Sequence, residues 1–260
     1  MVNEFKGTYA LILGGSDGLG YASAMKLARH GMNLIIFYRA ARIQQSDIDS
    51  RFKAIKDCGV TLHAFNADAT REDKMTGYMD QVKEALGNSK ISVLLHSISK
   101  GNLKPLTGEY ALNTADFQQT IHSMGLSLNL WTQHLIAADL FADKSQVLSF
   151  TSEGSSRPSA GYAAVSAAKA TLEILTKSMA VELAPLGIRA NCIQAGVTDT
   201  FSLSLIPNYE ELKAHALERN PFNELTSPEK VAEVVYLLCK EEASWINGTI
   251  VKVDGGESLQ

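Results

Sequence analysis

Long apolar runs, paired cysteines and an excess of basic residues are all absent from this sequence. Its apolar runs are far shorter than the roughly 20 residues that a membrane-spanning helix needs, and its first residues lack the apolar core of a signal peptide. The three cysteines are odd in number and far apart, which predicts reduced thiols (Cys58, Cys192, Cys239). The net charge of −4 indicates no nucleic-acid surface, and no histidine pair or histidine–cysteine pair has metal-ligand spacing. These absences favour a cytoplasmic protein without a membrane partner, a nucleic-acid partner or a bound metal.

What the sequence does contain is a regular alternation of apolar strand-like runs and amphipathic helical stretches. The strands are expected near residues 9–13, 33–37, 61–65, 91–95, 146–150, 188–193 and 249–253, with helices between them near 18–30, 46–56, 70–86, 114–140, 161–183 and 227–239. No linker or repeat interrupts the 260 residues. The pattern predicts one α/β domain over residues 1–260, a Rossmann-like, doubly wound parallel sheet of about seven strands.

A glycine-rich loop joins the first strand to the first helix. It reads Gly14-Gly-Ser16-Asp17-Gly18-Leu19-Gly20. Glycines at such a turn let the backbone approach a pyrophosphate, which lies at the positive N-terminus of the helix. The loop therefore predicts a dinucleotide cofactor, although the carboxylate of Asp17 would partly oppose a phosphate.

Arginines follow the second strand, where a dinucleotide fold faces the adenosine ribose. Arg39 and Arg42 stand there, and no carboxylate comes before Asp47. An acidic residue would bind a free ribose 2′-hydroxyl, whereas arginine accommodates a 2′-phosphate. The cofactor is therefore predicted to be NADPH. Asp68, after the third strand, either meets the adenine or caps the following helix.

Tyr162 and Lys169 lie in an alanine-rich helical stretch, seven residues apart. Seven residues turn a helix by about 700°, so both side chains lie on one side, roughly 10.5 Å apart along the axis. A fixed cation lowers the pKa of a nearby phenol. The pair is suited to donating a hydrogen bond to an oxygen that becomes negative during a reaction.

Taken in order, the glycine loop, Tyr162, Lys169 and the late Val-Asp-Gly-Gly make the chain resemble the short-chain dehydrogenase/reductase family over its whole length. The usual family pair is Tyr-x-x-x-Lys, but position 166 is serine here. The Tyr-x6-Lys spacing resembles the enoyl-acyl-carrier-protein reductases of that family, as does His96-Ser-Ile after the fourth strand. The ordinary glycine motif and Arg39 are more similar to the NADPH-dependent type III group.

The resemblance implies roles for individual residues. Lys169 would hold the nicotinamide ribose, and Tyr162 would bind the substrate oxygen. The expected cofactor-binding set is Gly14, Ser16, Asp17, Gly18, Leu19, Gly20, Arg39, Asp68, Ala69, Ser97, Lys169, Val197 and Thr200. The expected substrate-binding set is Ser99, Ser152, Tyr162, Phe201 and Leu205.

Two further polar residues are expected near this site. Ser152 has two possible roles, and His122 differs from the residue that carbonyl-reducing relatives carry. Ser152 follows the fifth strand and either supports the substrate oxygen as a catalytic residue or caps a turn. His122 stands where carbonyl-reducing members carry an asparagine that organises a proton-relay water, which weakens a carbonyl-reductase assignment. It could also be a core histidine.

Together these features predict an NADPH-dependent enoyl-acyl-carrier-protein reductase of fatty-acid elongation, acting on acyl thioesters. One alternative is a 3-oxoacyl thioester reductase or another carbonyl reductase, and a second is a non-catalytic NADP(H)-sensing protein. Residues 201–225 mix large apolar side chains with serines, prolines and charges, which predicts a substrate lid. The alanine-rich helix and the apolar helix before it predict a homotetramer.

Overall fold

The computed structural model describes residues 3–206 and 208–260, so Met1, Val2 and Pro207, which lies in the predicted lid, fall outside the described residues. Seven parallel strands form one sheet in the order β3-β2-β1-β4-β5-β6-β7. They are β1 (Tyr9–Leu13), β2 (Asn33–Tyr38), β3 (Leu62–Asn66), β4 (Ile91–His96), β5 (Phe141–Ser152), β6 (Ile188–Ala195) and β7 (Ile250–Val253). The predicted single-domain, doubly wound sheet is confirmed.

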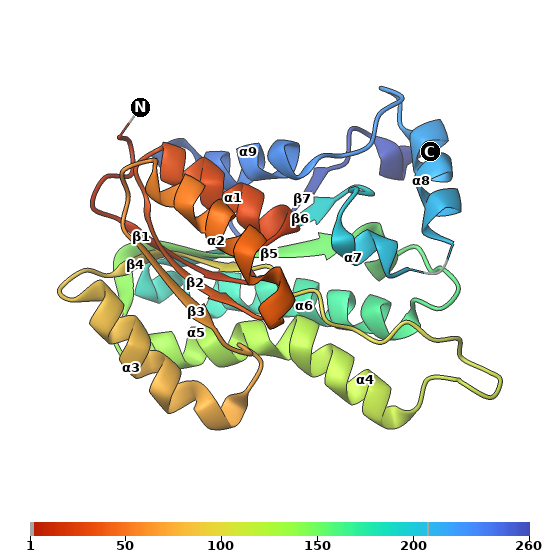
Figure 1. Ribbon diagram of the computed structural model, residues 1–260, viewed down its shortest axis with the longest axis horizontal. Coiled ribbons are helices and arrows are strands. Elements are labelled where there is room, and N and C mark those ends of the chain that lie inside the picture. The colour runs from red at the N-terminus through yellow and green to blue at the C-terminus, as the bar shows by residue number, and fades with distance from the viewer. Residues whose placement is uncertain (1–2, 207) are drawn as a thin grey trace.

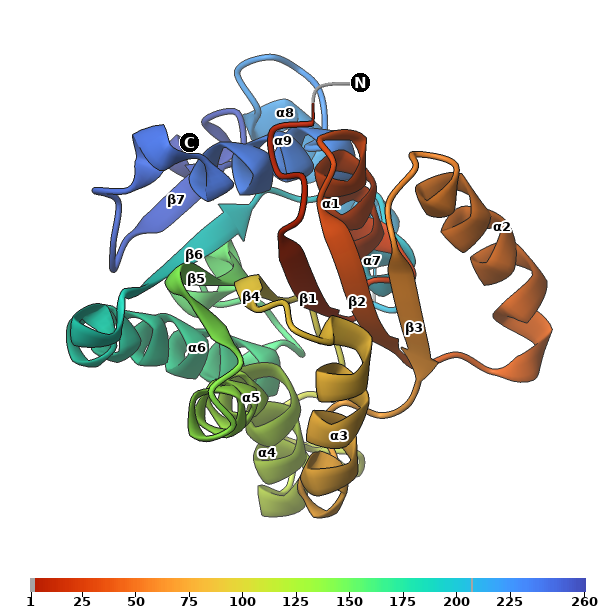
Figure 2. The same cartoon turned by 90° about the vertical axis from the view of Figure 1, so that its left-hand side faces the viewer.

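Helices cover both faces of the sheet (Figures 1 and 2). One layer contains α1 (Gly18–Arg29), α2 (Gln45–Lys56) and α9 (Pro228–Cys239), and the other contains α3 (Met75–Leu86), α4 (Thr114–Ile121), α5 (Ser127–Ala137) and α6 (Ala163–Glu182). Two further helices, α7 (Phe201–Ser204) and α8 (Tyr209–Arg219), lie beyond the carboxyl ends of β5 and β6 in Figure 1. No helix in the described part of the chain has the length and apolar character that crossing a membrane requires.

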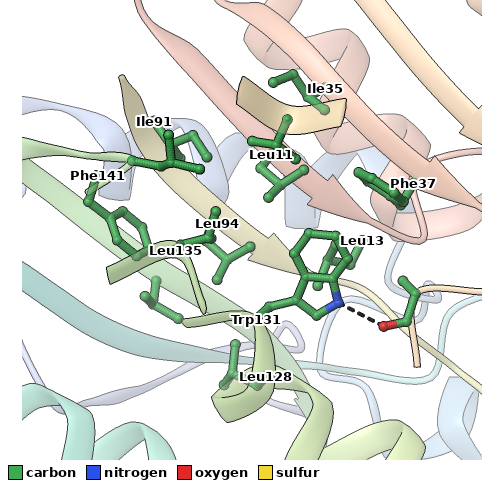
Figure 3. Packing of buried hydrophobic residues seen from close by; sticks show 14 of the residues in the cluster. Leu11, Leu13, Ile35, Phe37, Ile91, Leu94, Leu128, Trp131, Leu135 and Phe141 are labelled. Atoms are coloured by element: carbon green, nitrogen blue, oxygen red, sulfur yellow. Dashed lines mark hydrogen bonds between the residues drawn. The ribbon is translucent and has the colours of Figure 1, made fainter. Parts of the chain in front are cut away.

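The layer of α3, α5 and α6 packs on the sheet through a core centred on Trp131 (Figure 3). The indole is fully buried against Phe37, with ring centroids 4.8 Å apart, and it stacks on Tyr78 at 5.8 Å. Its Nε1–H donates to the carbonyl of Ala69, 2.7 Å away. The backbone of Ala69, a residue of the predicted cofactor site, is thereby tied to the core.

The expected helix over 114–140 is interrupted. Residues His122–Leu126 form a π-helical turn between α4 and α5, a feature that often marks functional sites. Periodicity could not reveal it, because one extra residue shifts the apolar stripe without breaking it. By contrast, the predicted start of α9 is confirmed, since the Ser227 hydroxyl accepts from the Lys230 N–H and Pro228 is the first helical residue.

Candidate active site

The glycine loop lies where the strand order reverses, between the adjacent strands β1 and β4. A Cβ on Gly14, whose φ is +89°, would lie 2.4 Å from the Ser97 carbonyl oxygen. A Cβ on Gly20 would lie 2.1 Å from the Gly14 carbonyl oxygen. Neither position therefore tolerates a side chain. The loop packs tightly against Ser97, which follows β4, and α1 begins within the loop at Gly18.

Other residues of the predicted cofactor set gather around this loop. The Ser97 hydroxyl lies 3.0 Å from the position of a Cβ on Gly20, and the Thr200 methyl carbon lies 3.5 Å from one on Gly18. The Val197 N–H donates to the buried carboxylate of Glu257, 3.1 Å away. Leu19 is half-buried against the core beneath α1, α2 and α9. Segments that follow β1, β4 and β6 thus meet at one edge of the sheet.

The charge of Asp17 is paired in the structure, which the sequence did not indicate. Arg51 of α2 lies with Nη1 3.0 Å from Asp17 Oδ1, and the same nitrogen donates to the Ser16 carbonyl at 2.9 Å. The carboxylate that was expected to oppose a phosphate therefore has a cationic partner from another helix.

Asp68 joins three segments beside the loop. Its Oδ1 accepts from the N–H and the hydroxyl of Thr70, and its Oδ2 accepts from Lys100 at 2.9 Å and lies 3.5 Å from Arg39 Nη1. Burial by itself would raise the pKa of Asp68. The hydrogen bonds from Thr70 and Lys100 outweigh this effect and lower the pKa to about 2. The capping alternative holds only for a local turn, because α3 begins at Met75. Lys100 is a neighbour that sequence reasoning missed.

An open hollow of about 620 Å³ adjoins Asp68. Lys100, Gln119, His122 and Ser123 are among the residues that line it. The His122 ring donates from Nε2 to the Thr70 carbonyl, 2.7 Å away. His122 therefore ties the π-helical turn to the segment that carries Asp68 and Ala69.

Tyr162 is the residue before α6 rather than a residue within it, so the expected helix start at 161 is two residues early. The Ser166 N–H still donates to the Tyr162 carbonyl at 2.9 Å, so the first turn is continuous. Lys169 lies on the buried side of α6, where its Nζ donates to the Phe150 carbonyl at 2.7 Å. Burial lowers the pKa of Lys169 to about 8.

The expected lowering of the Tyr162 pKa by Lys169 is wrong for this structure. Burial raises the pKa of Tyr162, opposed only by the nearby Ser152 hydroxyl. The Lys169 ammonium group is directed to a backbone carbonyl instead. Tyr162 is therefore a neutral phenol at neutral pH, and it is a donor of a hydrogen bond rather than a phenolate.

Ser152 faces the phenol. It is the N-cap residue of the short 3₁₀ turn Glu153–Ser155, but its side chain makes no capping hydrogen bond, which argues against the turn-capping alternative. Its Oγ is buried with no partner of good hydrogen-bond geometry among the described residues. A Cβ on Gly154 would lie 2.6 Å from the Tyr162 ring and 3.2 Å from Ser152 Oγ. Gly154, which the sequence did not single out, leaves room for the Tyr162 ring and the Ser152 hydroxyl.

His96, at the end of β4, is fully enclosed by the protein. Its Nε2 lies 2.8 Å from the Ser127 hydroxyl, and that hydroxyl donates to the Ser123 carbonyl. Burial, together with the charge of Lys169, lowers the pKa of His96 to about 3. The imidazole is therefore neutral, and it links the end of β4 to α5 and the π-helical turn.

Three residues of the predicted substrate-binding set are open to solvent, unlike Ser152 and Tyr162. Ser99 is exposed, and Phe201 and Leu205 are 61% and 60% exposed. By contrast α8 is anchored, since Lys213 pairs with Asp199 at 2.9 Å and Arg219 with Glu153 at 2.7 Å.

The residues present fit a dinucleotide cofactor. Two glycines of the loop admit no Cβ, α1 begins within the loop, and its N-cap residue Asp17 makes no side-chain cap. The first N–H groups of α1 are therefore left for an anion. No group of three or more histidine, cysteine, aspartate or glutamate side chains that could hold a metal occurs within residues 3–206 and 208–260.

Comparison with known proteins agrees with this arrangement. A family model described as enoyl-(acyl carrier protein) reductase matches residues 14–258. The cis-4-hydroxycyclohexanecarboxylate dehydrogenase of Sinomonas cyclohexanicum is 28% identical over 98% of both chains. The 1-cyclohexenylcarbonyl-CoA reductase of Streptomyces collinus is 27% identical over 96% of this chain and 86% of that protein.

Solved structures show the same fold. FabI from Candidatus Liberibacter asiaticus matches with a TM-score of 0.87 and 24% identity, over 100% of this chain and 98% of that one. A short-chain dehydrogenase from Burkholderia cenocepacia, solved in complex with NADP, matches with a TM-score of 0.83 and 26% identity, over 98% and 99%. The relatives include dehydrogenases and reductases with different substrates. Since the family model spans nearly all of the sequence, the chain belongs to the short-chain dehydrogenase/reductase family of nicotinamide-dependent oxidoreductases.

Proposed function

We propose that this protein is an NADPH-dependent reductase of 2-enoyl thioesters, with an acyl-carrier-protein thioester as substrate in fatty-acid elongation. The observation that carries the proposal is the seven-residue separation of Tyr162 and Lys169, with Ser166 at the position of the usual lysine. The description of the matching family model and the relative named as a cyclohexenylcarbonyl-CoA reductase support it. Three cysteines without disulfides are compatible with a cytoplasmic location.

The position of the phenol suits charge that develops away from the reduced carbon. In a 2-enoyl thioester the reduced carbon is C3, and the negative charge appears on the carbonyl oxygen two carbons further on. NADPH would supply the hydride to C3, and solvent or Tyr162 would supply the proton that C2 then takes. Neutral Tyr162 donates its hydroxyl hydrogen bond to the forming enolate oxygen, where a preorganised donor lowers the barrier. Ser152, whose buried hydroxyl lies beside the phenol, is placed to support the same oxygen.

Lys169 acts from within the protein. Its ammonium group lies beneath the site on the Phe150 carbonyl, where it can turn toward the ribose hydroxyls of the cofactor and add positive potential. The greater helical separation from Tyr162 leaves room between a ribose and the acyl carbonyl for two more carbon atoms.

A carbonyl reductase is the main rival, because Ser152 and Tyr162 together could also polarise a ketone. His122 speaks against it, since its ring is engaged with the Thr70 carbonyl and lines the hollow beside Asp68. The other rival is a protein that senses NADP(H) without turnover.

One spectrophotometric comparison tests all three. We expect oxidation of NADPH with a crotonyl thioester to be at least tenfold faster, as kcat/KM, than with a 3-oxoacyl thioester. The reverse order would establish the carbonyl reductase. Binding of NADPH without oxidation by either substrate would establish the sensor. Carrier-protein and coenzyme A thioesters compared at equal concentration would identify the carrier.

Arg39 is proposed to recognise the 2′-phosphate. Its side chain is 65% exposed, and its ion pair with Asp68 is long, at 3.5 Å. The guanidinium can therefore turn to a phosphate at little cost. Arg39→Ala should raise the Kd of NADPH by about tenfold, the scale of one lost charge-assisted contact, and leave that of NADH nearly unchanged. Calorimetric titration of both cofactors measures this. Arg42→Ala is the matched control, and a loss specific to NADPH in that variant alone would transfer the role to Arg42.

The substrate lid is proposed over residues 201–225. Because ion pairs anchor α8, the part of the lid that is expected to move is the segment before α8, around Phe201 and Leu205. Chymotrypsin should cut the free protein first near Phe201 or Leu205, and NADPH with an acyl ligand should protect these sites. Tyr110 and Trp245 are 76% and 97% exposed, which makes them internal controls. Ligand protection that is equal at Trp245 and Phe201 would rule out a lid.

The homotetramer is proposed on only some of the apolar residues of the two helices that first suggested it. Leu128, Trp131 and Leu135 are fully buried within one chain, as are Ala164 and Ala168, so they offer no surface to a partner. The large apolar side chains that are exposed on α6 and the π-helical turn are Leu126, which belongs to the first set, and Ile174 and Val181, which do not.

Light scattering at micromolar concentration should give about four times the chain mass of 28.2 kDa. Ile174→Lys should reduce that mass, because it buries a charge in the proposed contact. Ile43→Lys, at a position that is 90% exposed next to α2, should not. A monomeric parent with full activity would contradict the proposed assembly.

A further inference from the structure

Asp17 stands at the place in the glycine loop where a negative charge is least expected. It is the N-cap residue of α1, directly before Gly18, and its side chain does not cap the helix. A phosphate bound at the start of α1 would lie beside a carboxylate, and like charges at such separations repel. A loop with an unpaired aspartate would therefore bind a dinucleotide less well than its glycines allow.

Arg51 reaches this carboxylate from 34 residues further along the chain. Its Nη1 lies 3.0 Å from Asp17 Oδ1 and donates to the Ser16 carbonyl at 2.9 Å. Its Cζ also lies 5.7 Å from the centre of the Tyr21 ring on α1. One guanidinium group thus contacts the loop by charge, by hydrogen bond and by an aromatic face.

The reach of Arg51 is set by the packing of α2. The adjacent Phe52 is buried and packs edge-on against Tyr38, with ring centroids 5.1 Å apart, and Ile55 is fully buried. The Arg51 side chain is only partly exposed, at 37%. It therefore holds its position at lower entropic cost than a free surface arginine.

We propose that Arg51 is a positioning residue for the cofactor: it neutralises Asp17 and holds the Ser16 carbonyl, so that the glycine loop accepts the phosphates of a dinucleotide. The proposal rests on the proposed use of a nicotinamide dinucleotide. Because the pyrophosphate is common to NADPH and NADH, the effect of Arg51 should be shared by both cofactors. This separates it from Arg39, whose effect should be confined to NADPH.

The test is a double-mutant cycle on the full chain, with NADPH and NADH binding measured by calorimetry at low salt. Arg51→Ala should raise both Kd values by about five- to tenfold, since it leaves a partly exposed carboxylate unpaired beside the phosphates. Asp17→Asn alone should not weaken binding and should lower both Kd values, since it leaves the Arg51 charge unpaired beside the phosphates. In the double variant the loss should largely disappear, because no charge remains to be neutralised. Lys53→Ala, on the same helix and paired only with Asp57 among the described residues, is the matched control.

Each outcome is decisive. A loss for NADPH alone that Asp17→Asn does not rescue would mean that Arg51 binds the 2′-phosphate itself, which overturns the proposal. A loss for both cofactors without rescue would reduce the role of Arg51 to anchoring the Ser16 carbonyl, and it would overturn the charge argument. A parent that binds neither dinucleotide would refute both this inference and the proposed function. A parent that binds NADPH but leaves crotonyl thioester unreduced would refute only the enoyl-reductase proposal.

Discussion

Replacing Tyr162 by phenylalanine should lower kcat for an enoyl thioester by about 100- to 1,000-fold, the cost of removing one preorganised donor to a developing oxyanion. The phenol is neutral because burial raises its pKa, so what the variant loses is a hydrogen bond that strengthens as the oxygen becomes negative. The Kd of NADPH should stay within about twofold. Steady-state kinetics and cofactor titration of the same preparation measure the two quantities.

The matched control for this variant lies one helical turn away. Ser166 stands where the usual family lysine belongs, and its backbone N–H, rather than its side chain, contacts the Tyr162 carbonyl. Ser166→Ala should therefore keep nearly full activity. Ser152→Ala should fall between the two variants, since it removes the weaker partner of the same oxygen. If Ser166→Ala abolished activity while Tyr162→Phe did not, the assignment of the pair would be wrong.

Lys169→Met should remove most activity and weaken NADPH binding, because the ammonium group that is proposed to hold the ribose is lost. A loss of about 100-fold in kcat/KM is expected, with the Kd of NADPH raised by about tenfold. Methionine keeps much of the length and the apolar stem of lysine, so the packing of α6 should survive. Intact kinetics in this variant would remove Lys169 from the site.

The same variant has a second, independent readout in the pH dependence of stability. Burial lowers the pKa of Lys169 from its ordinary 10.5 to about 8 in the folded protein. Between pH 8 and 10.5 the unfolded chain therefore binds more protons than the folded chain, so this lysine makes the free energy of unfolding rise with pH across that window. Below pH 8 the cost of burying the charge is constant.

The difference in unfolding free energy, parent minus Lys169→Met, should accordingly increase as pH rises from 8 toward 10.5. The full window is worth on the order of 3 kcal/mol, since one pKa unit corresponds to about 1.4 kcal/mol. Urea unfolding of both proteins at matched pH cancels the other groups that titrate there. If this difference does not change between pH 8 and 10.5, the pKa of Lys169 is not lowered in the folded protein, and the burial argument is wrong.

Local patterns of this sequence predict much of the site. The apolar run before Gly14 and the amphipathic stretch after it predict β1 and α1, and the glycines predict a tight cofactor loop, in which the structure leaves no room for a side chain at Gly14 or Gly20. Alternating strands and helices imply a parallel sheet, because parallel neighbours need a crossover between them. The positions of Tyr162 and Lys169 along one segment are likewise local, so their spacing is readable without coordinates.

The partners of those residues are not local. Arg51 meets Asp17, Lys100 meets Asp68, and Lys169 meets the Phe150 carbonyl across separations of 34, 32 and 19 residues. The predicted lowering of the Tyr162 pKa failed for this reason, because burial outweighed a cation that packing had directed to a backbone carbonyl. Gly154 matters only because the Tyr162 ring folds over it.

The sequence by itself therefore determined the elements, their order in the chain and the chemical groups available to the site, since each depends on neighbours within a helical turn or along one strand. Tertiary structure decided which charges are paired, which hydroxyls are free and which helical turn becomes π-helical. These depend on how two layers of helices pack on the sheet. The periodicity of the sequence does not predict this packing, because the packing brings together segments that are distant along the chain and that match in shape and burial.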